Sequence, residues 1–199
     1  MIPIPLPTLL ERRWSLPVLA ELHRAKGAKF VTLAARTGAS RKAIRDTLAH
    51  LARLGLVMRN PGYGHPLRPE YLLTTRALQI GPRFQDLHDT LAAHNLLDAA
   101  LKKWSLPVLS LVSRTHGGAR FSELRTSLDI TDRALTLALK DLQRINLITR
   151  LVLDAYPPTT LYQATGRAAP VVAALETLLG EFPCPPAGAE RSRRRSASG

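Results

Sequence analysis

Residues 14–19 of the chain read WSLPVL, and residues 104–109 read WSLPVL again, which gives six identities at an offset of 90. From the glycine that follows each copy the offset is 91, as Phe30 and Phe121 show. A repeat of this length is too long for a solenoid unit, which has about 20 to 50 residues. The 199-residue chain is therefore expected to contain two copies of one small domain.

Each copy contains a short and a long helical pattern separated by a turn. In the second copy, Ser122 is expected to cap the short helix, in which Leu124 and Leu128 are apolar. Thr131 is a good N-cap for the long helix that follows. The apolar stripe of this helix consists of Leu135, Leu139, Leu142 and Ile145.

The first copy repeats this arrangement. Gly38 lies in the turn, and Ser40 is the expected N-cap of the long helix. The stripe of this helix consists of Ile44, Leu48, Leu51 and Leu54. A short and a long helix joined by such a turn predict a helix-turn-helix motif in each copy.

A strand-like pair follows each long helix. The four runs are residues 56–59, 71–74, 147–150 and 161–165. Each pair encloses a proline-containing turn signal, which predicts a hairpin, and a hairpin directly after a helix-turn-helix is a wing. Each copy then closes with an apolar helix, roughly residues 81–94 and 168–181.

These patterns predict a mainly α fold with small β wings (α+β), made of two tandem winged helix-turn-helix domains. We expect the first domain over residues 1–95, the second over residues 96–183, and a disordered basic tail over residues 184–199. The apolar flanks at the start of the two copies, around Leu9 and Leu101, are expected to face each other as in a dimer.

The start of each copy contains a proline within a helical pattern. A helix is expected to begin near Thr8 and to run toward Leu22, with Pro17 inside it and Pro107 at the equivalent place. Either a helix starts at this proline, where the missing N–H costs little, or a longer helix kinks there.

The charge of the chain favours polyanionic partners. It has 28 Lys and Arg against 15 Asp and Glu, a net charge of +13 and a sequence pI near 11.0. Residues 1–98 carry fourteen of the basic residues against seven acidic ones, so the first copy holds much of the excess. The alternative is a basic protein without a polyanionic partner.

The N-terminal sequence and the length of the apolar runs lead us to expect a cytoplasmic protein. The N-terminus lacks the basic region of a secretory signal, and no apolar run reaches the roughly 18 residues of a membrane span. We therefore expect no membrane partner.

The order of motifs in the second copy resembles the HxlR-type family of bacterial winged-helix transcription regulators. The matching motifs are Trp104, FSEL at 121–124, TDRALTLALKDL at 131–142, LITR at 147–150, YPP at 156–158 and LYQATG at 161–166. The first copy matches more loosely, because Thr75 replaces the final glycine and FVTL at 30–33 replaces FSEL. Members of this family are typically single domains that act as symmetric homodimers, so a fused pair departs from the pattern. The resemblance implies binding to double-stranded DNA and a dimer-like arrangement.

The long helix of the first copy carries the strongest candidates for DNA contact. With its apolar stripe buried, the first turns after Ser40 present Arg41, Lys42 and Arg45. Arginine and lysine pair with guanine O6 and N7 when the start of a recognition helix enters the major groove. In the wing, His65 and Arg68 are expected to reach phosphate or the minor groove.

The second copy offers a different set. Its candidates are Thr131, Arg133, Thr136 and Lys140. Asp132 stands where the first copy has Arg41 and faces phosphate unfavourably, so weaker binding is expected here. The alternative is that these side chains form an ordinary solvated helix face that contacts no DNA. The second wing carries an acid and no base between Arg150 and Tyr162, which is more typical of a packing surface.

The tail adds a further basic cluster, in which Arg193, Arg194 and Arg195 are candidates for phosphate contact. An inert solubilising end is the alternative.

The sequence contains no motif typical of catalysis or cofactor binding, such as a nucleophile elbow, a Gly-rich phosphate loop or an HExxH signature. His88 and His94 are spaced too loosely for a metal signature, and Cys184 is the lone cysteine. We expect neither an enzyme nor a cofactor or metal site.

The sequence favours a sequence-specific DNA-binding transcription regulator that acts as a covalent pseudo-dimer. It is expected to bind double-stranded DNA and possesses terminal helices suited to self-association. An alternative is a DNA-architecture or replication-associated factor that uses one winged helix for DNA and the other for a protein partner. A pure protein-interaction module is a third hypothesis.

Overall fold

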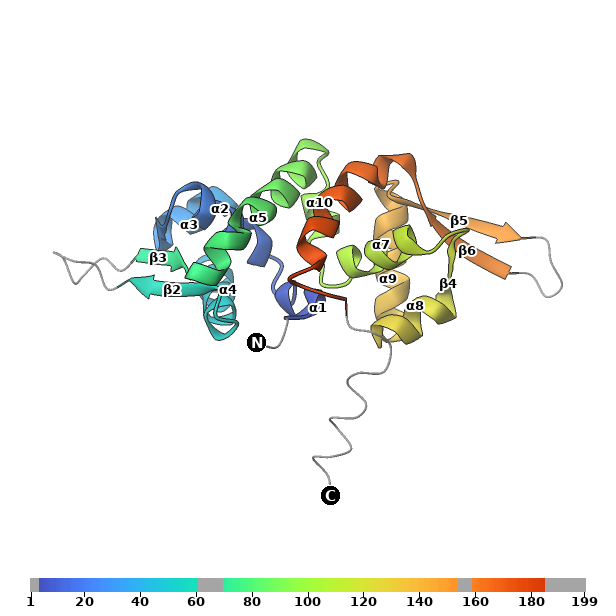
Figure 1. Ribbon diagram of the computed structural model, residues 1–199, viewed down its shortest axis with the longest axis horizontal. Coiled ribbons are helices and arrows are strands. Elements are labelled where there is room, and N and C mark those ends of the chain that lie inside the picture. Colours follow the sequence, from blue (N-terminus) through green and yellow to red (C-terminus); the bar gives the residue numbers. More distant parts are fainter. Residues whose placement is uncertain (1–3, 61–69, 154–158, 185–199) are drawn as a thin grey trace, which may run out of the picture. The chain divides into compact units, whose positions relative to one another are not determined.

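The computed structural model describes residues 4–60, 70–153 and 159–184, and these form two compact units (Figure 1). The first unit comprises residues 8–103. The second unit comprises residues 104–184 together with residues 4–7 from the start of the chain. The short helix α1 (Leu6–Leu9) spans the boundary between these two sets.

In the first unit, helices pack against a small sheet. The helices are α2 (Ser15–Arg24), α3 (Phe30–Thr37), α4 (Arg41–Arg53), α5 (Thr75–Ala93) and α6 (Leu97–Ala100). The strands in the described residues are β1 (Ala28–Lys29), β2 (Val57–Asn60) and β3 (Glu70–Leu73), in the antiparallel order β1-β3-β2. Helix α2 lies at the centre, because it contacts α3, α4 and α5.

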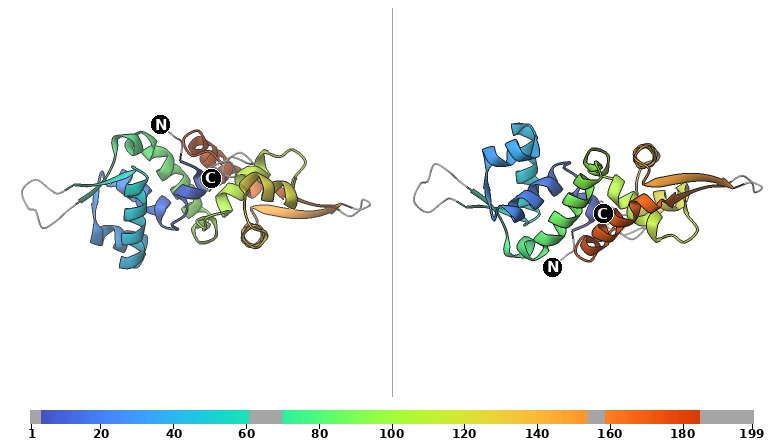
Figure 2. Two further views of the ribbon diagram at one scale, coloured as in Figure 1. Left: turned by 90° about the horizontal axis from the view of Figure 1, so that it is seen from below. Right: turned by 90° about the horizontal axis from the view of Figure 1, so that it is seen from above.

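The second unit has the same plan. Its helices are α7 (Ser105–Arg114), α8 (Phe121–Leu128), α9 (Asp132–Arg144) and α10 (Ala169–Leu179), with a 3-10 turn, η1 (Gly166–Ala168), before α10. In the described residues the strands are β4 (Ala119–Arg120), β5 (Ile148–Leu153) and β6 (Thr159–Ala164), in the antiparallel order β4-β6-β5. The strands of each hairpin extend beyond the helices of their own unit (Figure 2). The predicted fold class, two tandem winged helix-turn-helix units, is confirmed.

The caps of the long helices are those that the sequence predicts. Ser40 Oγ accepts a 3.2 Å hydrogen bond from the backbone N–H of Ala43, and Thr131 Oγ1 accepts one of 3.3 Å from Ala134. Gly38 ends α3 in the left-handed conformation, with a φ of 70°. Because these bonds join residues three positions apart, local sequence is enough to predict them.

The cap predicted for the short helix of the second copy is wrong. Helix α8 begins at Phe121, so Ser122 is its second residue and Arg120 precedes it. Strand β4 pairs with β6 and keeps Arg120 extended up to the start of the helix. The Glu123 side chain then accepts a 2.9 Å hydrogen bond from the backbone N–H of Arg120. The two-residue strands β1 and β4 were not predicted either, because a strand this short has no detectable period.

The N-terminal helix is divided, unlike the continuous helix expected from Thr8 to Leu22. Helix α1 ends at Leu9 and α2 begins at Ser15, with a turn between them. Pro17 is the third residue of α2, and Pro107 has the same place in α7. A proline in the first turn costs little, because its position needs no intrahelical N–H bond. Of the two alternatives, a helix start near the proline is therefore correct.

The closing helices differ in length from those expected. Helix α5 begins at Thr75, earlier than residue 81, and continues through Pro82. Thr74 caps it and also donates a 2.8 Å hydrogen bond to the carbonyl oxygen of Gly55. Thr165 donates the equivalent bond, 2.6 Å long, to Asn146. In both units this threonine joins the end of the wing to the turn after the long helix.

Candidate nucleic-acid interface

Helix α4 presents a basic surface at its start. Arg41, Lys42 and Arg45 are all exposed, on the face opposite the buried Ile44 and Leu48. This is the arrangement that the sequence predicts for the first turns of a recognition helix. The α4 basic face, as we call these three residues, is therefore available to a ligand.

One member of this face has an acidic neighbour on the same helix. Lys42 Nζ lies 2.9 Å from Asp46 Oδ2, one turn along α4. The hydrogen bond from Lys42 lowers the pKa of the Asp46 carboxyl, and the charges of Arg12 and Arg45 contribute. An exposed pair of this kind is weak, so a phosphate can displace Asp46 from Lys42.

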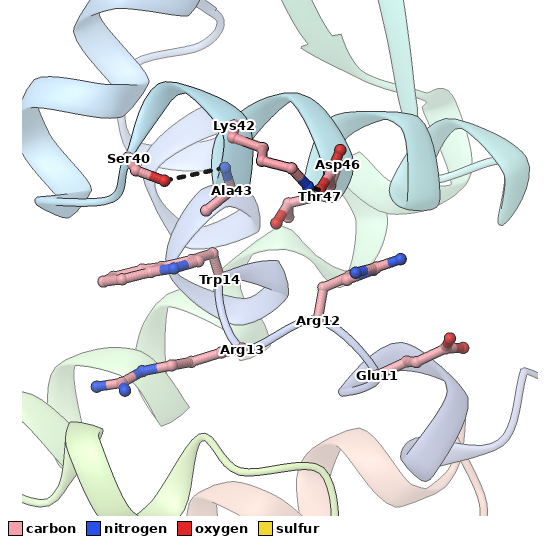
Figure 3. Close-up of a pocket in the computed structure, with 9 residues that line it drawn as sticks. All are labelled: Glu11, Arg12, Arg13, Trp14, Ser40, Lys42, Ala43, Asp46 and Thr47. Atoms are coloured by element: carbon pink, nitrogen blue, oxygen red, sulfur yellow. Dashed lines mark hydrogen bonds and ion pairs between the residues drawn. The ribbon is translucent and has the colours of Figure 1, made fainter.

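A groove of about 330 Å³ runs beside the start of α4. The turn between α1 and α2 provides one wall through Glu11, Arg12, Arg13 and Trp14, and α4 provides the other. In Figure 3 the Trp14 ring lies across the groove from Ser40 and Ala43, and the Arg12 side chain extends on the side of Asp46 and Thr47. Arg12 is exposed, so it adds a positive charge to the same surface as the α4 basic face.

Sequence reasoning missed Arg12. A signal for it existed in the repeat, because a basic pair precedes the repeated tryptophan in both copies, as Arg12-Arg13 and as Lys102-Lys103. Arg13 has other contacts: its guanidinium carbon lies 5.4 Å from the centre of the Trp14 ring, and it forms an ion pair with Asp98.

Helix α9 of the second unit differs from α4. Thr131, Arg133 and Lys140 are exposed, whereas Thr136 is half-buried. Asp132 accepts a 3.3 Å hydrogen bond from Arg125 of α8. Leu137, which is 54% exposed, stands where α4 has Asp46. This face is therefore less basic and more apolar than that of α4.

The wings differ in the same sense. Strand β2 exposes Met58 and Arg59, whereas β5 exposes Leu151, Val152 and Leu153 in succession. Strand β5 lies at the edge of its sheet. The predicted wing contacts His65 and Arg68 lie outside the described residues, as do Arg193, Arg194 and Arg195 of the tail.

In the described residues, His, Cys, Asp and Glu side chains form no group of three or more that would suit a metal ion. Within the same part of the chain, every helix is too short or too polar to cross a membrane.

Comparisons with known proteins identify the domain type. The HxlR-like helix-turn-helix family matches residues 9–97 and again residues 100–182. No curated protein matches the chain.

Two solved structures show similarity to it. One, from Enterococcus faecalis V583, is described as a transcriptional regulator of the MarR family; it is 24% identical, with 55% of this chain and 91% of that chain covered and a TM-score of 0.40. The other is YodB from B. subtilis after diamide treatment, 24% identical, with 48% and 92% covered and a TM-score of 0.35.

The family matches together span most of the chain and coincide with the two helix-turn-helix motifs described above. The chain therefore belongs to the HxlR-like helix-turn-helix family, a family of transcription regulators and not of enzymes, and it carries two copies of the family's domain.

Proposed function

We propose that this protein is a sequence-specific transcription regulator that binds double-stranded DNA as a covalent pseudo-dimer. The observation that carries the proposal is the α4 basic face, with Arg12 across the adjacent groove. Side chains at the start of a recognition helix contact base edges, while flanking cations contact phosphate and set the register.

In this proposal the two units have unequal roles. Arg41, Lys42 and Arg45 of the first unit read bases, with Ser40 at the start of the helix, and His65 and Arg68 extend the contact from the wing. In the second unit Thr131, Arg133, Thr136 and Lys140 make a weaker contact, because Asp132 lowers the local positive potential. The operator then contains two half-sites of different sequence, about one helical turn, or roughly 34 Å, apart.

We further propose that the chain functions as two domains, residues 1–95 and 96–183. Their terminal helices provide the surface through which the protein self-associates. The tail from residue 184 onward adds sequence-independent attraction to phosphate through Arg193, Arg194 and Arg195. The protein is expected to act in the cytoplasm at the nucleoid, where a transcription regulator meets its operator.

A binding selection from random duplexes tests this function directly. The full chain is incubated with the library at fixed salt, and the bound sequences are then compared with a scrambled duplex by gel-shift titration. Specific regulators typically bind their operators about 10³-fold or more tightly than other DNA. Equal affinity for all duplexes contradicts the proposal.

One set of observations favours the alternative, a DNA-architecture or replication-associated factor. The second unit exposes Leu137 on α9 and, in succession, Leu151, Val152 and Leu153 on β5, which give this strand an apolar surface. Such a surface suits a protein partner. Under this alternative the first unit binds DNA without sequence preference, so the same selection distinguishes the two functions.

A further inference from the structure

The first unit contains a second cavity, of about 280 Å³, between α2, the end of α3 and the α5–α6 segment. Trp14, Pro17, Leu97 and Leu101 form its apolar wall, and Glu21, Arg24 and Arg36 are among its charged lining residues. An apolar cavity of about 150 Å³ is large enough to bind benzene. The cavity of the first unit is therefore large enough for a small organic molecule with one ring.

A buried carboxylate organises the charged side of this cavity. The Glu21 side chain is only 7% exposed, and its oxygens accept hydrogen bonds of 2.5 Å from Arg36 and 3.3 Å from Arg24. Arg24 also donates a 2.6 Å hydrogen bond to Asp89. A carboxylate removed from water needs such partners, because unpaired burial of a charge is costly.

Arg36 has binding capacity that Glu21 does not use. Its side chain is 56% exposed, and in the described part of the chain its guanidinium has no partner besides Glu21. A guanidinium carries five N–H donors arranged to match a carboxylate. Arg24, by contrast, divides its charge between Glu21 and Asp89. Of the two arginines that pair with Glu21, Arg36 therefore keeps more N–H donors for a ligand.

The second copy shows that the fold does not need this network. The positions equivalent to Glu21, Arg36 and Asp89 hold Leu111, Ser127 and Gly180. The helices are nevertheless preserved, since α7 and α8 have the lengths of α2 and α3. The charged network is thus a property of the first copy alone, which points to a role other than folding.

The cavity also adjoins the elements that position α4. Trp14 and Arg13 line both this cavity and the groove beside the start of α4. Thr37 lines it as well, and its hydroxyl accepts a 3.3 Å hydrogen bond from the backbone N–H of Ala39 in the turn before α4. A molecule in the cavity therefore contacts Trp14, which also lines that groove, and Thr37, which is hydrogen-bonded to that turn.

We propose that this cavity binds a small organic acid with a ring-sized apolar body. The carboxylate of the ligand pairs with Arg36, and its ring packs against Trp14, Pro17, Leu97 and Leu101. Occupancy shifts the turn before α4 and so changes the affinity for DNA, a consequence that rests on the function proposed above. The binding itself does not depend on that function.

Fluorescence of Trp14 tests the binding without DNA. In the full chain carrying Trp104→Phe, Trp14 is the single tryptophan, and its emission is followed during titration with benzoate. Benzyl alcohol is the neutral probe of similar size, and acetate is the charged probe without a ring. We expect a saturable change with benzoate and none with the other two. No saturation by 10 mM benzoate, or an equal response to benzyl alcohol, overturns the proposal.

Arginine variants in the same background locate the site. Arg36→Leu is expected to weaken benzoate binding roughly tenfold or more, because a charge-assisted hydrogen bond is lost. Arg125→Leu is the matched control, since Arg125 is the exposed last-turn arginine of the equivalent helix α8, and it is expected to leave binding unchanged. Arg36→Lys keeps the charge without the paired donors, so its affinity for benzoate is expected to lie between those of Arg36→Leu and Arg125→Leu. If Arg36→Leu does not fold, the affinity of Arg36→Lys for benzoate is the test. An affinity equal to that of the parent protein shows that benzoate does not bind at Arg36 and overturns the proposed site.

A gel shift of the selected operator, with and without saturating benzoate, tests the coupling. An allosteric effect of about fivefold or more in Kd is expected. Benzoate binding with unchanged DNA affinity overturns the coupling. Absence of DNA binding altogether contradicts the proposed function, while the fluorescence result still decides the cavity.

Discussion

The buried carboxylate of Glu21 and the guanidinium of Arg36 lie 2.5 Å apart, although one residue belongs to α2 and the other to the end of α3. Leu111 and Ser127 occupy the equivalent positions of the second copy. The same two positions thus hold an ion pair in the first unit and uncharged residues in the second.

This comparison leads to a prediction about stability. Glu21→Leu, which copies the second repeat, is expected to leave the free energy of unfolding nearly unchanged or to raise it, because buried ion pairs are often replaceable by apolar residues. Arg36→Leu leaves Glu21 with Arg24 alone and is expected to destabilise by about 1–2 kcal/mol, a value reduced because Arg36 is partly solvated. Urea denaturation of the full chain measures the free energy of unfolding of both variants. A larger loss of stability in Glu21→Leu than in Arg36→Leu contradicts this prediction.

Base recognition is expected to depend mainly on the first unit. Replacing Lys42 and Arg45 by Ala should weaken specific binding by roughly 1–3 kcal/mol per lost base contact. Arg133→Ala, which changes the position equivalent to Lys42, should cost less because Asp132 weakens the contact there. Gel-shift titrations at one salt concentration compare the variants, and the opposite ranking would show that α9 is the principal reading helix.

Arg12 is expected to contact phosphate, not a base, because it lies on the turn before α2 and across a groove from α4. Arg12→Ala should weaken binding to the operator and to a scrambled duplex alike, and should reduce the slope of log K against log salt by about 0.9. Arg53→Ala, an exposed change in the last turn of α4, serves as the control. A loss confined to the operator would instead indicate base contact.

Removal of residues 187–199 is expected to affect affinity without affecting specificity. The segment contains Arg191, Arg193, Arg194 and Arg195 and no large apolar residue, so its expected contribution is attraction to phosphate. The slope of log K against log salt should fall by up to about 0.9 for each lost contact. A changed ratio of operator to scrambled affinity, measured in the same titrations, would mean that the tail reads bases.

Cys184 is expected to react slowly with alkylating reagents. Burial raises the pKa of its thiol above the ordinary value, although the nearby Ser110 hydroxyl and the charge of Arg114 act in the opposite direction. A raised pKa lowers the thiolate fraction at neutral pH, and the thiolate is the reacting species. Iodoacetamide labelling between pH 7 and 10, followed by mass spectrometry, should show a slower rate than for glutathione and a rise at higher pH. Labelling faster than that of glutathione at pH 7 contradicts a raised pKa for Cys184.

Features that depend on neighbours three or four positions away could be predicted from the sequence. Ser40 and Thr131 cap their helices as expected, because a cap bond joins residues close in the chain. Ile44, Leu48 and Leu51 of α4 and Leu135, Leu139 and Leu142 of α9 are buried for the same reason. The last predicted members of the two stripes, Leu54 and Ile145, instead follow the helix ends and are half-buried. Of the candidate site, the exposed positions Arg41, Lys42 and Arg45 followed directly from that periodicity.

The sequence by itself determined the repeat, the two helix-turn-helix motifs with their wings, and the basic face of α4, since each is a local pattern of period and capping chemistry. Only the tertiary structure decided that Arg12 shares a groove with α4, that Glu21 meets Arg24 and Arg36, and that residues 4–7 belong with the second unit. These relationships join residues distant in the chain. They depend on how helices pack and on which charges must find partners when water is excluded, and no local pattern contains that information.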